Sequence, residues 1–366
     1  MRVTRVSARD FRNLERAEAA LGDAVTVVHG PNGAGKTNLL EALYFGCTAR
    51  SCRTSNEREV VRFGAKVARV EVEVEAADGA HRLEVGLEPG EAKRVKMDGA
   101  ALNGPAGTDV RPLVSVFMPD RLELVKGAPA LRRAHLDQLI AALWPSRAAN
   151  RAAYSRALAQ RNALIARVRA GAAAPSLLDT WDAELATAGI AVMSDRGEAS
   201  ALLAPRFAER AGDLGLPDEA SLAYRPRSRA GDSEALRAEL HERRDEDLQR
   251  GFSAHGPHRD EVLLAHAGKP LRAYGSQGQQ RLGLLALLFA ERDALLEARG
   301  RPPLMLLDDV MSELDSARRE RLIELLVAGG QAVITTTDLE HVPGAADEGI
   351  ASLAVMSGQL AQEPVA

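Results

Sequence analysis

A glycine-rich turn between a strand-like run and a helix-like run constrains this chain more than any other feature of its sequence. Ala24–Val28 is apolar and β-branched, and the residues after Lys36 have the apolar spacing of a helix. Between them stands Gly30-x-x-x-x-Gly35-Lys36-Thr37, a P-loop pattern in the strand–turn–helix context that it requires. The sequence therefore predicts an α/β domain that binds a nucleotide.

The residue types of this turn suit phosphate chemistry. Glycines let backbone N–H groups wrap around phosphates, and the N-terminus of the following helix adds a favourable dipole. We expect Lys36 to reach the β- and γ-phosphates of ATP and the Thr37 hydroxyl to ligate Mg²⁺. A simple glycine-rich turn is the alternative, but lysine is scarce in this chain. The predicted ATP-binding residues are Gly30, Pro31, Asn32, Gly33, Ala34, Gly35, Lys36 and Thr37.

A second pattern, Leu304–Asp309, is an apolar strand that ends in paired carboxylates. At the carboxyl end of such a strand, Asp308 is expected to complete the Mg²⁺ site of a P-loop protein. Asp309 is the predicted catalytic residue, placed to polarise the attacking water. An acidic turn after a buried strand is the alternative, and the P-loop elsewhere in the chain makes it the weaker interpretation.

A third pattern, Tyr-Gly-Ser-Gln-Gly-Gln-Gln-Arg at Tyr274–Arg281, precedes the long apolar run Leu282–Leu296. Ser276 suits a helix N-cap, and Gly278 allows a phosphate to approach the backbone. One chain hardly needs two phosphate-binding helix starts at one γ-phosphate. We therefore expect this second start to serve ATP held by a partner subunit, with a simple capped core helix as the alternative.

The distribution of apolar residues predicts one sheet domain interrupted by a helical lobe. Alternation in Val70–Glu75 and Leu83–Leu87 indicates an antiparallel meander near the start of the chain. Alanine-, leucine- and arginine-rich helical sequence follows from about Ala130, and strand patterns return after Gly256. The predicted ATPase domain comprises residues 1–128 and 251–366, and the helical lobe residues 129–250. Four prolines are expected to divide the lobe into pieces: Pro145, Pro175, Pro205 and Pro226.

Composition excludes several classes of protein. With 47 basic and 51 acidic residues the net charge is −4, so a uniformly basic nucleic-acid coat is excluded. Two cysteines exclude a disulfide scaffold. The sequence has no apolar run near the roughly 18 residues that a membrane span needs, and its start lacks the pattern of a signal peptide. These features predict a cytoplasmic protein without a membrane partner.

One segment is basic although the chain as a whole is acidic. Residues 130–170 contain eight arginines against the single acid Asp137. Such an excess can neutralise a phosphate backbone, but a solvated helical surface explains it almost as well. The candidate DNA contacts in this segment are Arg132, Arg133, Arg161, Arg167 and Arg169.

Taken together, these motifs resemble those of the RecF family of bacterial recombinational repair, over nearly the whole chain. The resemblance is carried by Asp10–Asn13, Gly33–Ala42, Arg53–Ser55, Pro119–Gly127, Arg132–Asp137, Gly256–Asp260, Ser276–Arg281, Leu307–Asp315 and Thr335–Asp338. It implies a P-loop ABC-type ATPase head, similar to SMC and Rad50 heads, that dimerises around two ATP molecules. It also implies DNA binding at single-strand gaps and ss–ds junctions, with RecR and RecO as partners in loading RecA.

The resemblance assigns roles to individual positions. Ser276, Gly278 and Gln279 would be the signature that contacts the partner's ATP, and Ser312–Asp315 would cross the dimer interface. Thr337 or Asp338 would take the switch position. Pro31 stands where a polar residue is usual, and position 309 is Asp where transporter ATPases usually have Glu, which implies slow hydrolysis. The alternatives are an SMC-like clamp in which ATP only controls dimerisation, and a transporter ATPase subunit.

Overall fold

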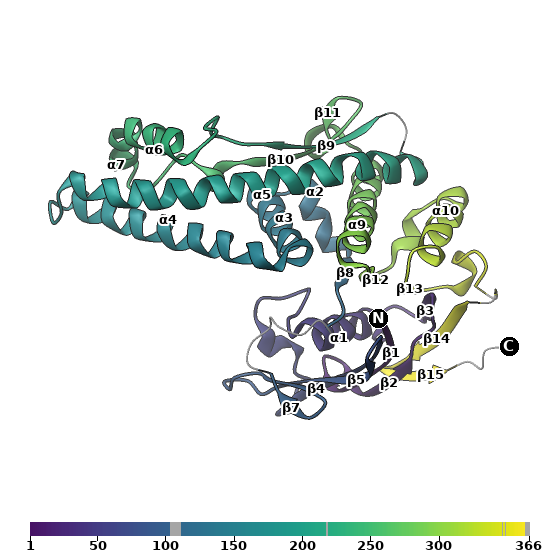
Figure 1. Ribbon diagram of the computed structural model, residues 1–366. Helices are drawn as coiled ribbons and strands as arrows, with labels where there is room; N and C mark the ends of the chain where they lie inside the picture. The colour runs from purple at the N-terminus through teal and green to yellow at the C-terminus, as the bar shows by residue number, and fades with distance from the viewer. Residues whose placement is uncertain (103–110, 217–218, 346, 348, 363–366) are drawn as a thin grey trace. The chain divides into compact units, whose positions relative to one another are not determined.

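Two sheets contact the helix that follows the glycine-rich turn, α1 (Lys36–Thr48). This computed structural model describes residues 1–102, 111–216, 219–345, 347 and 349–362. Both sheets belong to a first compact unit, which consists of Met1–Arg121 and Leu295–Ala366. The predicted α/β domain with an antiparallel meander is confirmed (Figure 1).

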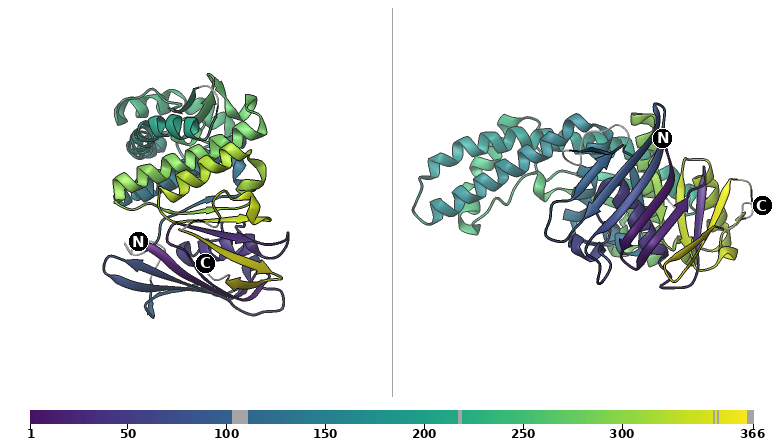
Figure 2. Two further views of the ribbon diagram at one scale, coloured as in Figure 1. Left: turned by 90° about the vertical axis from the view of Figure 1, so that its right-hand side faces the viewer. Right: turned by 90° about the horizontal axis from the view of Figure 1, so that it is seen from below.

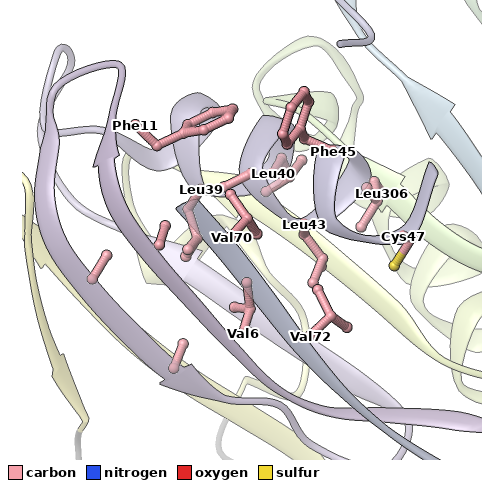
Figure 3. Packing of buried hydrophobic residues seen from close by; sticks show 14 of the residues in the cluster. Val6, Phe11, Leu39, Leu40, Leu43, Phe45, Cys47, Val70, Val72 and Leu306 are labelled. Carbon is pink, nitrogen blue, oxygen red and sulfur yellow. The ribbon is translucent and has the colours of Figure 1, made fainter. Parts of the chain in front are cut away.

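One sheet is antiparallel, and one of its faces is apolar. In β1 and β4 the inward residues, such as Val6, Val70 and Val72, are buried, while their neighbours along each strand face outward. The buried residues pack against Leu43 and Phe45 of α1 (Figure 3), and each contributes about 1.5–3 kcal/mol by burial. The strand order is β2 (Leu14–Ala20), β1 (Arg2–Phe11), β4 (Ala68–Ala76), β5 (Gly79–Leu87), β6 (Arg94–Met97) and β7 (Ala100–Ala101).

The other sheet is parallel except at one edge, and its central strands are buried along their length. Its order is β15 (Gln359–Gln362), β14 (Ile350–Met356), β3 (Val25–His29), β13 (Ala332–Thr336), β12 (Leu304–Leu307) and β8 (Val114–Phe117). Strand β13 therefore lies between β3, which leads into the glycine-rich turn, and β12, which leads into the paired carboxylates. The carboxyl ends of these three strands meet at one edge, where ligands bind in open parallel sheets. Helix α10 (Ser316–Val327) follows β12.

The second compact unit, Leu122–Ala294, is dominated by helices. Helices α4 and α5 run side by side along it (Figure 1). The bounds are α2 (Glu123–Lys126), α3 (Pro129–Leu143), α4 (Ala148–Arg169), α5 (Leu178–Asp213), β9 (Ala220–Arg225), α6 (Ser233–Glu242), α7 (Arg244–Arg250), β10 (Glu261–His266), β11 (Lys269–Pro270) and α8 (Leu271–Tyr274). Helix α9 (Gln277–Arg299) begins in this unit and ends in the first.

One detail of this unit differs from the expectations. The expected break at Pro205 is wrong, because α5 continues through it and buries Leu203 and Phe207 on either side; that packing outweighs the about 3 kcal/mol cost of an internal proline. The unit also extends beyond residue 250, since β10 pairs with β9 and β9 packs on α5. The division into an ATPase domain (1–128 and 251–366) and a lobe (129–250) stays a prediction.

Within the described ranges, no helix combines the length and the apolarity that crossing a membrane requires.

Candidate nucleotide site

The glycine-rich turn has a backbone that other residues would not adopt. Gly30 has φ 147°, and a Cβ atom at this position would lie 2.2 Å from the carbonyl oxygen of Val355 in β14. Gly35, at the start of α1, has φ 117°. The intervening Pro31, Asn32 and Gly33 are exposed. Glycine at the two ends therefore allows the turn to close over the N-terminus of α1.

Lys36 is buried inside this turn. Its Nζ atom donates to the carbonyl oxygens of Gly30 at 2.7 Å and Pro31 at 3.0 Å. Burial lowers the pKa of Lys36, while the charges of Asp309 and Asp308 oppose that shift. Within the described part of the chain this ammonium has no ion pair, so a phosphate oxygen is a suitable partner for it.

Thr37 and Asp308 meet although 271 residues separate them. The Thr37 hydroxyl lies 2.9 Å from each carboxylate oxygen of Asp308. Burial raises the pKa of Asp308, and the hydrogen bonds from Thr335 and Thr37 oppose that rise. A hydroxyl and a buried carboxylate held together are hard oxygen donors of the kind that Mg²⁺ prefers. The residues present therefore fit the predicted metal.

Thr335, at the end of β13, was not among the residues predicted from the sequence. Its hydroxyl donates to Asp308 Oδ1 at 2.7 Å and accepts from the Asp309 N–H at 2.8 Å. The side chain is fully buried. Because β13 lies between β3 and β12, this threonine holds both carboxylate residues in place. In the sequence it is marked by its position near the end of an apolar strand and by the Thr335–Asp338 stretch of the family resemblance, neither of which gives it a role.

Asp309 combines an unusual backbone conformation with an unpaired carboxylate oxygen. Its backbone is left-handed, with φ 49°, which costs energy for any residue other than glycine. Its Oδ1 atom is buried and has no hydrogen-bond partner in the described ranges. An unpaired carboxylate oxygen near the predicted phosphate site suits the polarisation of water.

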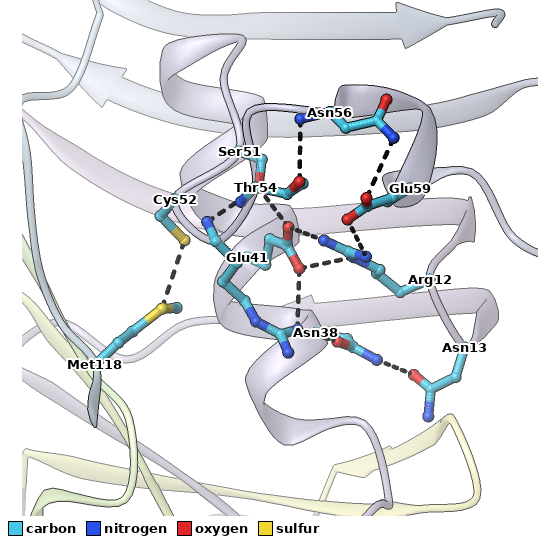
Figure 4. Close-up of polar contacts among 11 residues, drawn as sticks. Arg12, Asn13, Asn38, Glu41, Ser51, Cys52, Thr54, Asn56, Glu59 and Met118 are labelled. Atoms are coloured by element: carbon cyan, nitrogen blue, oxygen red, sulfur yellow. Dashed lines mark hydrogen bonds and ion pairs between the residues drawn. The ribbon is translucent and has the colours of Figure 1, made fainter. Parts of the chain in front are cut away.

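Side chains from two other segments of the chain converge on the buried carboxylate of Glu41, one turn after Thr37 on α1 (Figure 4). Arg12 donates to both of its oxygens, at 2.8 and 3.0 Å, and Arg53 and Ser51 donate at 3.2 and 2.6 Å. Asn13, next to Arg12, donates to the carbonyl oxygen of Gly33 at 3.3 Å. The network therefore joins the β1–β2 turn to the tip of the glycine-rich turn.

The predicted signature lies in the second unit, at the start of α9. The Ser276 N–H donates to Gln279 Oε1 at 2.8 Å, and the Gln279 N–H donates to Ser276 Oγ at 3.2 Å. This reciprocal pair is a capping box. Ser276 and Gly278 are exposed, and the space beside Gly278 is open. The geometry agrees with a capped core helix, and the exposed start leaves room for a partner's phosphate.

The remaining positions suggested by the family resemblance lie in the first unit. The Ser312 hydroxyl donates to the carbonyl oxygen of Asp309 at 3.0 Å, and Asp315 caps α10 by accepting from the Arg318 N–H. Thr337 and Asp338 are exposed and follow Thr336, the last residue of β13.

Two of the five candidate DNA contacts are wrong, because their side chains are buried in ion pairs. Arg161 is fully buried and contacts Asp182 at 2.7 Å and Asp247 at 2.6 Å. Arg132 pairs with Glu261 at 2.9 Å and donates to the carbonyl oxygens of residues 124, 125 and 127, at the end of α2. These guanidinium groups stabilise the second unit and are not available to DNA.

The other three candidates are accessible to different degrees. Arg133 is half-buried and donates to the carbonyl oxygen of Asp260, whereas Arg167 and Arg169 are exposed. Of the neighbouring arginines, Arg147 pairs with Glu198 and Arg151 with Asp137. Three arginines of this segment, Arg132, Arg147 and Arg161, are therefore paired with acids from elsewhere in the chain, which removes part of its basic excess.

The chain matches the model of the RecF/RecN/SMC N-terminal domain over residues 2–357. It is 41% identical to the DNA replication and repair protein RecF of Anaeromyxobacter dehalogenans (strain 2CP-C), with 98% of each chain covered. It is 38% identical to the protein of that name from Streptomyces avermitilis, over 94% of this chain and 95% of the relative.

Solved structures agree with these sequence matches. The recombination mediator protein RecF-ATP in the RecFOR pathway superposes with a TM-score of 0.87 at 27% identity, over 99% of this chain and 97% of the other. The Smc head domain of Pyrococcus furiosus gives a TM-score of 0.57 at 18% identity, over 98% of this chain and 94% of the other, which is a likeness of fold alone. The predicted fold, an ATPase head with an antiparallel meander and a helical insertion, is confirmed.

Proposed function

Because this chain belongs to the RecF family, we propose that it is an ATP-dependent DNA-binding protein of replication and recombinational repair. It acts at single-strand gaps and stalled forks and, with RecR and RecO, helps load RecA. The observation that supports ATP binding best is the convergence of Lys36, Thr37 and Asp308 after the carboxyl ends of β3 and β12, the two parallel strands on either side of β13.

Each of these residues has a role in the proposed site. The backbone N–H groups of the turn and the buried ammonium of Lys36 bind the β- and γ-phosphates. Thr37 and Asp308 would hold Mg²⁺, which would supply positive charge that offsets the charge of the phosphates. Thr335 keeps Asp308 in position, and Asp309 accepts a hydrogen bond from the attacking water.

The proposed site is completed by a second copy of the chain. Ser276, Gly278 and Gln279 of that copy contact the γ-phosphate through the exposed start of α9. ATP then lies in the dimer interface, and ADP, which lacks the γ-phosphate, does not stabilise the dimer. Hydrolysis releases the two copies.

The carboxylate at position 309 favours slow hydrolysis. An Asp side chain is one methylene shorter than the Glu that is usual in transporter ATPases, so the base is held further from the water. ATP therefore acts mainly as a dimerisation switch. Gap-stimulated hydrolysis that disappears in Asp309→Asn supports this mechanism, whereas ATP-dependent dimers without such hydrolysis favour an SMC-like clamp.

The direct test is ATP affinity in a lysine variant. Lys36→Met removes a charge-assisted bond of about 1.5–3 kcal/mol, so ATP affinity should fall at least about tenfold. Lys126→Met, which changes an exposed lysine in the other unit, should bind ATP as the wild type does. Wild-type protein should bind a gapped duplex more tightly with ATP than with ADP. Unchanged ATP binding in Lys36→Met, or equal DNA binding with both nucleotides, contradicts the proposal.

A further inference from the structure

The outer face of the antiparallel sheet carries a row of arginines that the nucleotide site does not use. The pairing registers place Arg16 of β2 opposite Arg9 of β1, and Arg9 opposite Arg69 of β4. Arg69 lies opposite Gly86 of β5, and Gly86 opposite Arg94 of β6. We call Arg16, Arg9, Arg69 and Arg94 the arginine row. With strands about 4.8 Å apart, the row spans about 19 Å across five strands.

All four guanidinium groups are exposed to solvent. Each arginine of the row is exposed, whereas Ala8 and Val70, the strand neighbours of Arg9 and Arg69, point into the core. Within the described ranges, none of the four has a hydrogen bond or an ion pair. Like charges directly opposite one another destabilise an antiparallel sheet. The repulsion within the row therefore lowers the stability of the fold, and a bound anion would reduce that repulsion.

Other arginines on the same face form ion pairs with carboxylates. Arg5, four residues before Arg9, pairs with Glu18 at 2.8 Å, and Arg82 pairs with Glu73 at 3.4 Å. Both side chains are about half exposed, at 50% and 54%. Carboxylates are thus available on this sheet, and two of them, Glu71 and Glu84, line a hollow together with Arg69 and Arg94. Within the described residues, none of these carboxylates forms an ion pair with the arginine row.

A groove beside the row extends the same charge. It has a volume of 480 Å³ and is lined by Arg9, Arg16, Arg69 and the exposed Lys66. Its two carboxylates, Asp10 and Glu15, are both occupied by Arg62, at 2.8 and 3.6 Å. The row and this lysine, which lies just before β4, therefore present five neighbouring cations that have no partner among the described residues.

We infer that the arginine row and the adjoining groove bind the phosphate backbone of DNA. This inference rests on the proposed function and identifies a DNA-contacting surface for it. A guanidinium group pairs with phosphate oxygens through two parallel hydrogen bonds. Each DNA strand of a duplex presents a phosphate about every 3.4 Å along the helix axis. A DNA backbone that runs across the β-strands of the sheet therefore meets several arginines of the row. Such contacts carry affinity without sequence preference.

The test compares two variants of the full-length protein. Arg9→Gln/Arg69→Gln/Arg94→Gln removes three charges from the row, and Arg5→Gln/Arg82→Gln removes two paired charges from the same face. Binding to a labelled gapped duplex is measured by fluorescence anisotropy with ATP, over a series of salt concentrations. Free energies of unfolding are measured alongside.

The triple variant should bind at least about tenfold more weakly at about 0.1 M salt, and its salt slope should fall by about 2–3. Its stability should equal or exceed that of the wild type, because opposed charges have been removed. The paired-charge control should bind as the wild type does. If both variants lose the same amount of affinity for the gapped duplex, or if the triple variant loses none, the inference is overturned while the proposed function stands.

Wild-type protein that does not bind the gapped duplex overturns both proposals. A further arm uses poly-glutamate as competitor. Poly-glutamate and an unlabelled duplex of unrelated sequence are compared as competitors at the same concentration of negative charge. If poly-glutamate displaces the labelled duplex from the wild type and the unlabelled duplex does not, the row binds acidic protein and the inference is overturned.

Discussion

Replacement of Thr335 by valine tests whether one hydroxyl positions both carboxylate residues. Valine has nearly the same shape as threonine, so Thr335→Val removes the hydroxyl without opening a cavity. It deletes the bond donated to Asp308 at 2.7 Å and the bond accepted from the Asp309 N–H at 2.8 Å. A bond to a charged group contributes about 1.5–3 kcal/mol, and a buried N–H left without a partner costs about 1–3 kcal/mol.

We therefore expect Thr335→Val to lower the free energy of unfolding by about 3 kcal/mol, measured by urea denaturation. Thr335→Ser keeps both bonds and loses only a buried methyl group, so it should cost about 1 kcal/mol. The comparison of the two variants isolates the hydroxyl from the packing of β13.

The same pair of variants separates positioning from nucleotide binding. Lys36 and the glycine-rich turn are untouched in Thr335→Val, so ATP affinity without Mg²⁺ should stay within about twofold of the wild type. ATP hydrolysis should fall by at least about tenfold, because about 1.4 kcal/mol of misplacement already costs that factor. Valine and serine variants with equal stability and equal hydrolysis would refute the role given to the hydroxyl.

Two further predictions concern a histidine and the glycine-rich turn. Burial lowers the pKa of His258 to about 4, so only the unfolded chain gains this proton as the pH falls from about 6.5 to 4. The wild type should therefore lose about 3 kcal/mol over that range relative to His258→Gln, measured by urea denaturation; parallel pH profiles would contradict it. Gly30→Ala should cost at least about 3 kcal/mol, since its Cβ would meet Val355. Gly33→Ala, in open space, should cost only about 1–2 kcal/mol, and equal losses would refute this account.

The nucleotide site was predictable where its signal is local. The turn from Gly30 to Thr37 and the carboxylates after β12 each combine a buried strand with a short polar motif. Thr335 was not predictable, because its role depends on the strand order that places β13 between β3 and β12. Nothing in a single segment specifies that order.

Charge counted along the sequence was a poor guide to the surface. The partners of Arg161 are 21 and 86 residues away, and the partner of Arg132 is 129 residues away, so part of a local excess of arginine is paired on folding. The arginine row shows the opposite effect, since its members come from four strands and meet only through the pairing registers. Both outcomes follow from long-range contacts that a local window does not contain.

The central claim, that ATP is held between two copies of this chain, is tested most directly by mixing two variants in sedimentation velocity. Lys36→Met lacks the phosphate-binding lysine, and Ser276→Arg places a bulky side chain at the exposed start of α9. Each variant alone should remain monomeric with ATP. Their mixture should form dimers with ATP and not with ADP, because a mixed dimer rebuilds one site from the intact halves. The shared site would be contradicted if Ser276→Arg dimerised normally by itself. It would also be contradicted if the mixture stayed monomeric under conditions in which the wild type dimerises.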